Sequence, residues 1–275
     1  TGNVSLTSTA GDISLTQGGN SLGGSVAASG TNVSLVDSTA LQLGNVTATG
    51  TLSATSTLGI TQASSTALVV GGGTQLSAGS LSSITLGQSG NQLTGAIGVS
   101  SGRDLTVNTG GNLTLGTTST LRNVTLTATG DIQQNQALTA TGNVSATSTG
   151  GHVVLSQAGN AVSGNVSASG ADVTIANSSA LVLATVTATG QLTASSANGI
   201  TQTAGGSVSA GGLTQLSADA THDITLGNAA NSLSGQVNVS SVNHATLRTS
   251  GALLLGNITT QGNLQGTSAG SITQA

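Results

Sequence analysis

The sequence contains no cysteine, proline, methionine, tryptophan, tyrosine or phenylalanine. Without cysteine there is no disulfide framework, no thiolate nucleophile and no thiolate metal site. Without aromatic residues or methionine, the core has to be built from valine, leucine, isoleucine and alanine, which suits a narrow and regular interior. Without proline, no residue removes a hydrogen bond from the ladder of a β-sheet.

Charge is also scarce. Charged residues make up 4% of the 275 residues, and three Lys+Arg against seven Asp+Glu give a formal net charge of −4. Binding to nucleic acid needs a basic stripe that displaces counterions from phosphates, so we expect no nucleic-acid partner. Few groups remain for acid–base chemistry. We therefore expect no enzymatic activity, no catalytic residue and no cofactor.

The composition separates the chain from disordered and membrane-spanning proteins. Disordered chains combine low hydrophobicity with high net charge, whereas 36% of these residues are hydrophobic and the net charge is small. The longest runs of branched apolar residues, such as Leu68-Val69-Val70, have only three residues. A spanning helix needs about 20 apolar residues, so we expect no membrane insertion of this segment.

What the sequence does contain is alternation. Apolar and polar residues alternate in short segments such as Val33-x-Leu35, Leu113-x-Leu115 and Val173-x-Ile175. This period of two is typical of a strand with one buried and one wet face. In the clearest stretch the strand centres recur at a spacing of eight, at Leu52, Ile60, Leu68, Leu76 and Ile84. No segment shows helical periodicity.

A longer repeat is superimposed on this alternation. Four similar segments start near positions 13, 84, 153 and 224, which is a nearly constant period of roughly 70 residues of the kind that marks a repeat architecture. Each contains an asparagine followed by an apolar residue and a glycine, and these asparagines are Asn20, Asn91, Asn160 and Asn231. Alternate repeats resemble each other closely; for example, Thr74-Gln-Leu-Ser-Ala78 recurs two repeats later as Thr214-Gln-Leu-Ser-Ala218.

A fixed repeat of short strands, too small to bury its own apolar face, indicates a solenoid. We predict an all-β fold, a parallel β-helix (β-solenoid) with about three short strands per coil. Each repeat would form three or four coils, and the chain about 12–16 coils. Positions 1–275 would form a single continuous solenoid of four such repeats. Because the sequence begins and ends inside a repeat, we expect it to be part of a longer protein.

The repeats also resemble a known family. The block Gly44-Asn-Val-Thr-Ala-Thr-Gly-Thr-Leu-Ser-Ala54, closing on Gly59-Ile-Thr-Gln62, is similar to the shaft repeats of filamentous-haemagglutinin-type proteins. The Asn-x-[Leu/Val]-x-Gly motif at the four asparagines is similar to repeats in biofilm adhesins of that family. The resemblance implies a right-handed β-helix and export through an outer-membrane secretion partner of the two-partner route. It also implies adhesion at the bacterial cell surface or in an extracellular matrix.

The candidate metal ligands are few. His222 and His244 are separated by about the length of one coil and could lie on neighbouring coils, with Asp219 and Asp223 nearby, whereas His152 is too distant to share an ion with them. These ligands lack the tight spacing of a metal site, and no tandem Gly-Gly-x-Gly-x-Asp repeat for calcium is present. We therefore expect no metal site.

The remaining polar residues are interpreted as structural. The seven carboxylates are not clustered as a glycosidase would require, and Arg103 beside Asp104 is expected to form a solvated pair at a turn. The asparagines Asn20, Asn91, Asn160 and Asn231 are predicted to be structural turn residues that bond to the local backbone and tolerate left-handed geometry. Pairs such as Thr47/Thr49 and Thr127/Thr129 skip coils, which argues against a regular ice-binding face.

Together with the family resemblance, which implies secretion and adhesion, these observations predict a structural shaft of a secreted bacterial fibrous adhesin, which gives length and rigidity for cell adhesion or for a biofilm matrix. Two alternatives stay open. One is a binding surface on the solenoid for ice or glycan, with host or matrix glycans as partners. The other is an amyloid-like matrix fibre in which like molecules stack end to end.

Overall fold

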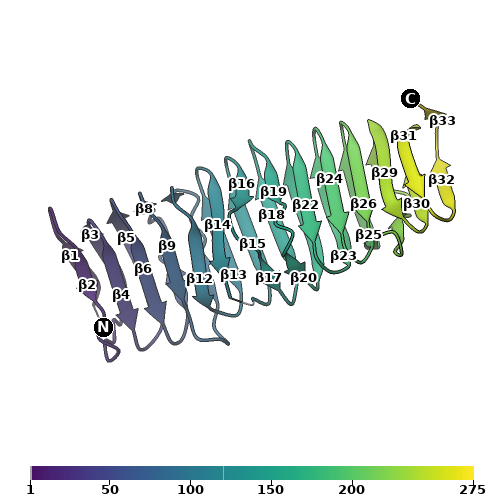
Figure 1. Cartoon of the computed structure of the whole chain (residues 1–275). Helices are drawn as coiled ribbons and strands as arrows, with labels where there is room; N and C mark the ends of the chain where they lie inside the picture. The colour runs from purple at the N-terminus through teal and green to yellow at the C-terminus, as the bar shows by residue number, and fades with distance from the viewer. Residues whose placement is uncertain (1, 120) are drawn as a thin grey trace. The chain divides into compact units, whose positions relative to one another are not determined.

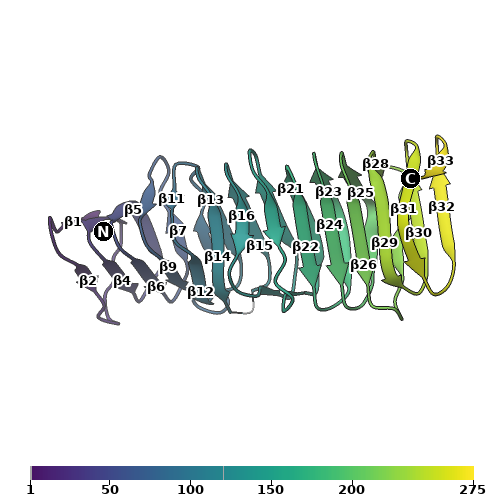
Figure 2. The same cartoon turned by 45° about the horizontal axis from the view of Figure 1, so that its top comes forward.

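A computed structural model describes residues 2–119 and 121–275, with Ser241 described by its backbone alone. The described residues contain β-strands, turns and loops but no helix, and hence no helix that could span a membrane. The chain divides into two compact units, residues 1–139 and 140–275. Within each unit parallel strands stack turn upon turn, as Figures 1 and 2 show. The predicted all-β parallel β-solenoid is confirmed, with about 13 turns in all.

Unit 1 has two stacks of parallel strands, which we call its first and second sheets. The first sheet consists of β1 (Val4–Thr7), β3 (Ser25–Gly30), β5 (Leu41–Ala48), β7 (Ile60–Gln62), β8 (Leu68–Val70), β10 (Ile84–Leu86), β11 (Gln92–Leu93), β13 (Leu105–Thr109) and β15 (Val124–Ala128). The second sheet consists of β2 (Ile13–Leu15), β4 (Val33–Asp37), β6 (Leu52–Ser56), β9 (Thr74–Ser77), β12 (Ile97–Ser101), β14 (Leu113–Thr118) and β16 (Ile132–Gln134).

Unit 2 repeats this arrangement. Its first sheet consists of β18 (Val144–Ser148), β21 (Asn165–Gly170), β23 (Leu181–Ala188), β25 (Ile200–Ala210), β27 (Ile224–Leu226), β28 (Ser232–Leu233), β30 (Ala245–Thr249) and β32 (Leu264–Ser268). Its second sheet consists of β19 (Val153–Leu155), β22 (Val173–Asn177), β24 (Leu192–Ser196), β26 (Thr214–Ala218), β29 (Gln236–Val242), β31 (Leu253–Thr260) and β33 (Ile272–Gln274). The unit boundary falls within the short strand β17 (Thr139–Ala140), and β20 (Ala161–Val162) lies outside both sheets.

The number of strands per turn varies along the solenoid. Where β7, β8 and β9 follow one another, a turn has the three short strands that the spacing of the strand centres predicts. Strand β5 pairs with both β7 and β8, through Leu41–Leu43 and Val46–Ala48, so two of these strands belong to one sheet. In other turns, such as β13 with β14, the first sheet has a single strand and the turn has two. The prediction of about three strands per coil therefore holds for only part of the chain. The corner within the first sheet interrupts the strand in some turns and leaves it continuous in others.

The structure also relates the sequence repeat to the turns. Successive partners in the second sheet run from Ile13 through Val33, Leu52 and Thr74 to Ile97. One turn therefore takes roughly 20 residues, and one sequence repeat is about three and a half turns. As a result Ile13 lies in the second sheet of unit 1, whereas its counterpart Ile84 lies in the first sheet.

The half turn explains why alternate repeats resemble each other most. In unit 2, Val153 again lies in the second sheet and Ile224 in the first sheet. Residues two repeats apart therefore occupy the same place in a turn, and residues one repeat apart occupy opposite sheets. Among the described residues each unit has seven second-sheet strands, which makes one unit the length of one complete structural period.

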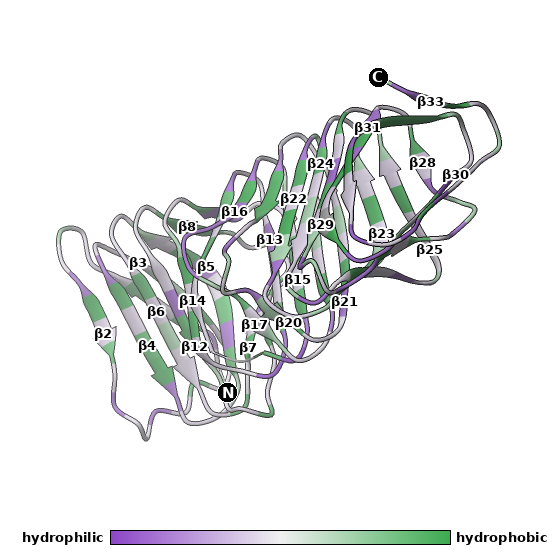
Figure 3. Ribbon diagram, turned by 45° about the vertical axis from the view of Figure 1, so that its right-hand side comes forward, coloured by the Kyte–Doolittle hydropathy of each residue, from purple (hydrophilic) through white to green (hydrophobic). Residues whose placement is uncertain are grey.

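The core is a column of small branched side chains. Along most strands inward positions are buried and outward positions are mostly polar, and Figure 3 shows this alternation of hydropathy. Leu35, Leu52, Ile60 and Leu76 are at most 1% exposed. Each turn thus adds a thin apolar layer that is covered by the next turn, which is how a solenoid gains stability from its neighbours.

Candidate functional site

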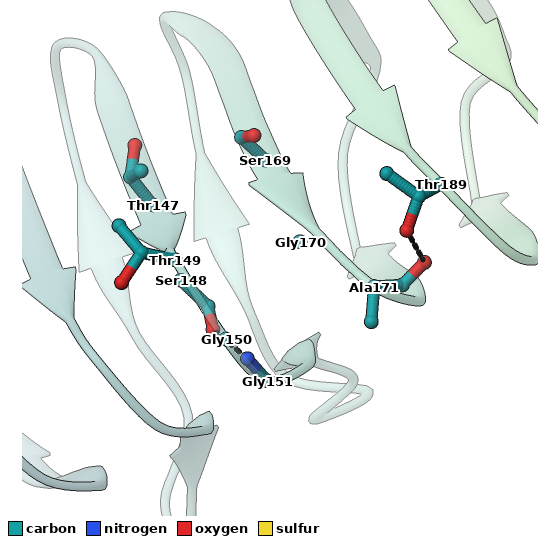
Figure 4. Close-up of a pocket in the computed structure, with 9 residues that line it drawn as sticks. All are labelled: Thr147, Ser148, Thr149, Gly150, Gly151, Ser169, Gly170, Ala171 and Thr189. Carbon is teal, nitrogen blue, oxygen red and sulfur yellow. Dashed lines mark hydrogen bonds between the residues drawn. The ribbon is translucent and has the colours of Figure 1, made fainter.

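A groove in unit 2 is lined only by small neutral residues. It has a volume of about 370 Å³ and lies where strands of the first sheet end (Figure 4). Its lining residues are Thr147, Ser148, Thr149, Gly150, Gly151, Ser169, Gly170, Ala171 and Thr189. The Ser148 hydroxyl oxygen accepts a hydrogen bond from the Gly151 N–H at 2.8 Å, and Thr189 donates weakly to the Ala171 carbonyl at 3.5 Å. The groove therefore presents hydroxyl groups and backbone rather than titratable groups.

Unit 1 has a groove at the equivalent place. It has a volume of about 240 Å³ and is lined by Thr7, Ser8, Thr9, Ser29, Gly30, Thr31, Thr47 and Thr49. All of these except Thr47 are the counterparts, two repeats earlier, of residues that line the groove in unit 2. Neither groove is lined by a carboxylate, an imidazole or a basic side chain, so neither offers a general acid, a general base or a metal ligand.

The predicted turn asparagines of the second and fourth repeats are buried, and each pairs with the side-chain amide of a half-buried glutamine. Asn91 and Asn231 are 0% exposed. Asn91 and Gln62 exchange two hydrogen bonds, of 2.7 and 2.9 Å, and the Asn91 side chain also accepts from the Leu68 N–H. Asn231 and Gln202 form the same pair at 2.7 and 3.0 Å. Each pair joins side chains from different turns and fixes one corner to the next turn.

The asparagines of the first and third repeats use a different arrangement. Asn20 donates to the Leu15 carbonyl at 3.2 Å, and Asn160 donates to the Leu155 carbonyl at 3.1 Å. None of the four asparagines has a positive φ. Among the described residues other than glycine, Ser65 alone has a positive φ. Asn20 and Asn160 therefore bond to the nearby backbone, and none of the four asparagines uses left-handed geometry.

A ladder of side-chain acceptors connects the turns, and it was not predicted from the sequence. Asp12 accepts from the Asn32 backbone N–H at 3.0 Å, and Asn32 in turn accepts from the Thr51 N–H at 2.9 Å. In unit 2, Nδ1 of His152 accepts from the Asp172 N–H at 3.2 Å. Asp, Asn and His are interchangeable in this ladder because each presents an acceptor atom to the next turn. Its only sequence signal is a spacing equal to the length of one turn.

The histidines take part in these connections between turns. Asp223 accepts from the His244 N–H at 3.0 Å, and Nδ1 of His244 accepts from the Asn263 N–H at 2.7 Å. His222 lies on the neighbouring turn, where its carbonyl accepts from the Asn243 N–H. Among the described residues no three His, Cys, Asp or Glu side chains gather closely enough to hold a metal ion.

One acidic residue near His222 is paired locally. The hydroxyl and the backbone N–H of Thr221 donate to Asp219 at 2.7 and 3.0 Å. These bonds lower the pKa of the Asp219 carboxyl below its usual value. The arrangement stabilises a turn, and it leaves Asp219 ionised at neutral pH.

A charged cluster lies on adjacent turns of unit 1. Asp104 forms ion pairs with Arg103 at 2.8 Å and with Arg122 at 3.0 Å. It also accepts from Asn123 and Ser83. Partial burial raises the pKa of Asp104, but the hydrogen bonds from Arg122, Arg103 and Asn123 outweigh it and hold the pKa well below its usual value. The sequence predicts the pair of Arg103 and Asp104, whereas the contact of Arg122 with Asp104 is seen only in the structure, because the sequence does not show which residues face each other on neighbouring turns.

A row of threonines is the other feature that only the structure shows. Thr61, Thr85, Thr106 and Thr125 are aligned in register on four successive turns of the first sheet in unit 1. All four point outward, since their strand neighbours Ile60, Ile84, Leu105 and Val124 are buried. The Thr-x-Thr pairs in the sequence did not predict this row, because one member from each turn, and not a pair, forms it.

The fold and these sites define a parallel β-solenoid repeat protein of a structural kind. The comparison with known families agrees, since a family described as "Repeats of unknown function (DUF5649)" matches residues 30–100, 102–169, 170–240 and 242–275. The chain belongs to this family of repeats. Its matched segments keep the period found in the sequence, and each begins less than one turn after the starts at 13, 84, 153 and 224. No curated protein and no solved structure matches the chain.

Proposed function

We propose that this chain is the shaft of a secreted bacterial adhesin or biofilm-matrix fibre, and that its role is to provide length and stiffness. The observation that carries this proposal is the register: in each unit, turn after turn pairs in parallel and buries one thin apolar layer. Because such layers add, a longer array of repeats is a longer rod rather than a larger globule. The grooves without titratable groups are consistent with a structural role.

The resemblance to filamentous-haemagglutinin-type repeats adds the setting. In this proposal the chain is exported through an outer-membrane secretion partner and lies at the cell surface or in the extracellular matrix. The absence of cysteine supports it, because an unfolded chain without disulfides can pass through a pore. The low content of charged residues also suits the passage of an unfolded chain through a pore.

The test is immunogold electron microscopy on intact cells that produce the protein. Antibodies against this chain should label the cell surface or the surrounding matrix. Duplicating residues 84–223 within the gene adds one structural period of seven turns, and should move a tip label outward by about 34 Å at about 4.8 Å per turn. Label confined to the cell interior would contradict the setting, and an unchanged tip distance would contradict the shaft.

A second function, a glycan-binding surface, is favoured by the hydroxyl-lined grooves. Equivalent grooves occur in both units, so one chain offers two weak sites that act together through avidity. Binding of the full chain to a glycan array tests this function separately from export and length.

A further inference from the structure

Arg103 and Arg122 of unit 1 are not needed for the hydrogen bond that connects neighbouring turns. In unit 2 the position equivalent to Asp104 is His244, whose Nδ1 accepts from the Asn263 N–H just as Asp104 accepts from the Asn123 N–H. The positions equivalent to Arg103 and Arg122 are Asn243 and Gly262. The same connection between turns thus forms without any arginine, so the two arginines call for an explanation other than the fold.

The two guanidinium groups are held in place with donors to spare. Arg122 uses Nε and one Nη on Asp104, and Arg103 uses Nε on Asp104 and one Nη on Ser83. Each guanidinium has five N–H donors, so about six of the ten remain for another partner. The arginine side chains are 44% and 55% exposed, whereas Asp104 is 18% exposed. The carboxylate is therefore enclosed and the unused donors face solvent.

The Asp104 carboxylate has no acceptor position left for a further hydrogen bond. Its two oxygens accept from both arginines, from the backbone and side chain of Asn123 and from the Ser83 hydroxyl. The cluster carries two positive charges and one negative charge, and two of the three basic residues of the whole chain are in it. This leaves a net positive, fork-shaped donor set, the geometry that recognises a carboxylate in two-point fashion.

The threonine row runs directly beside this cluster. Thr85, Thr106 and Thr125 follow Ser83, Asp104 and Asn123 by two positions on successive turns. Neighbouring turns are about 4.8 Å apart, so the row presents a regular line of hydroxyl groups next to the arginines. A ligand that reaches both features needs an acidic group and a chain of hydroxyls.

We propose that Arg103 and Arg122, with the row of Thr85, Thr106 and Thr125, bind a uronate-containing polysaccharide. The arginines hold one sugar carboxylate and the threonines hydrogen-bond to neighbouring hydroxyls. The net charge of −4 disfavours duplex nucleic acid, which carries one charge per about 1.7 Å along its axis, because a single positive cluster cannot offset that repulsion. This inference deepens the glycan-binding function proposed above and rests on it, but it needs neither export nor the shaft.

The experiment is isothermal titration of the full chain with hexagalacturonate at low salt, where exposed charges are least screened. The control ligand is fully methyl-esterified hexagalacturonate, which keeps the hydroxyls and loses the charge. We expect binding of the acid and at least about tenfold weaker binding of the ester, as for the loss of a charge-assisted pair of hydrogen bonds. No binding of the acid, or equal binding of the ester, would overturn the proposal.

Variants locate the site. Arg103→Gln/Arg122→Gln should weaken binding of hexagalacturonate about tenfold or more, and Arg122→Lys should weaken it less because it keeps the charge but not the fork. Arg248→Gln removes the third arginine, which is exposed and lies in unit 2, and should change affinity less than about twofold. Circular dichroism confirms that each variant is folded. Equal losses for Arg248→Gln and the double variant would show a nonspecific charge effect and overturn the proposal, while retained binding of neutral glycans on an array would leave the broader glycan-binding function standing.

Discussion

At the scale of single residues, the corners of this solenoid are held by polar side chains that are buried and paired. Asn231 is 0% exposed, and its amide exchanges hydrogen bonds with Gln202 and accepts from the Val208 N–H. Asn20 is only half-buried, and its side chain donates to the Leu15 carbonyl alone. Equivalent motif positions therefore differ in how many buried groups depend on them.

Asn231→Ala is expected to lower the free energy of unfolding by about 2–3 kcal/mol, because it leaves the Val208 N–H buried without a partner and removes both hydrogen bonds between Asn231 and Gln202. Asn20→Ala is the matched control and should cost about 1 kcal/mol or less. Urea denaturation followed by circular dichroism measures both. Equal costs for the two variants would show that the buried pair adds nothing.

Thr214 presents the opposite case, a buried hydroxyl without a partner. Its side chain is 0% exposed, it lies in register between Leu192 and Val237, and its Oγ1 has no hydrogen bond among the described residues. Thr214→Val should raise the free energy of unfolding by about 1 kcal/mol, since it removes an unsatisfied polar group. Thr225→Val, at an exposed position of β27, corrects for strand propensity. A lower stability of Thr214→Val than of Thr225→Val would contradict this account.

Asp104 should make the free energy of unfolding depend on pH in the acidic range. Its pKa is lower in the folded chain than in the unfolded chain, so the folded chain binds fewer protons in this range. The resulting stabilisation is present above the ordinary aspartate pKa, near 4, and is lost as the pH falls from there towards the lower folded value. We expect a loss of about 1 kcal/mol. Denaturation midpoints at several acidic pH values measure it, and Asp104→Asn should flatten this part of the curve; an unchanged pH dependence would contradict the role of Asp104.

At the scale of elements, each strand is short and depends on its neighbours for its hydrogen bonds. Strand β24 has five residues and pairs with β22 on one side and β26 on the other. A single defect in such a strand therefore disturbs three turns. The absence of proline from the whole sequence is consistent with this requirement.

Thr193→Pro, at the second residue of β24, should lower the free energy of unfolding by about 3 kcal/mol or more, because it removes a donor of the ladder and crowds the neighbouring strand. Thr193→Val keeps the N–H at the same site and should stay within about 0.5 kcal/mol of the parent. Thermal unfolding compares the two variants. Similar stability for the proline variant would mean that the ladder is not continuous at this strand.

Much of the element level could be predicted from the sequence, and the exceptions have physical reasons. The alternation of Val33 with Leu35 predicts a strand because burial on one face enforces it. The number of strands in a turn could not be predicted, because the same corner of the first sheet takes two forms. In one turn it is a bulge within β5, and in the next it is a loop between β7 and β8. The pairing of Asn91 with Gln62 across more than one turn could not be predicted either, because it depends on turn lengths that vary.

At the scale of the whole molecule, the sequence repeat corresponds to a fixed number of turns. One sequence repeat spans about three and a half turns, so equivalent residues alternate between the two sheets and coincide only after two repeats. The period was evident in the sequence, but the half turn was not, because sequence similarity does not reveal the sheet to which a strand belongs. In this account, sequence length becomes rod length through stacked turns within each unit.

The most direct test of that claim is a distance measured across several turns of unit 1 by electron paramagnetic resonance. Gln42 and Thr125 are exposed and are linked in register through Thr61, Thr85 and Thr106, so they lie four turns apart. The chain has no cysteine, so Gln42→Cys/Thr125→Cys can be spin-labelled without background. The account predicts one narrow distribution near about 19 Å, from four steps of about 4.8 Å. A broad distribution near about 50 Å, as for a flexible segment of this length, would contradict it.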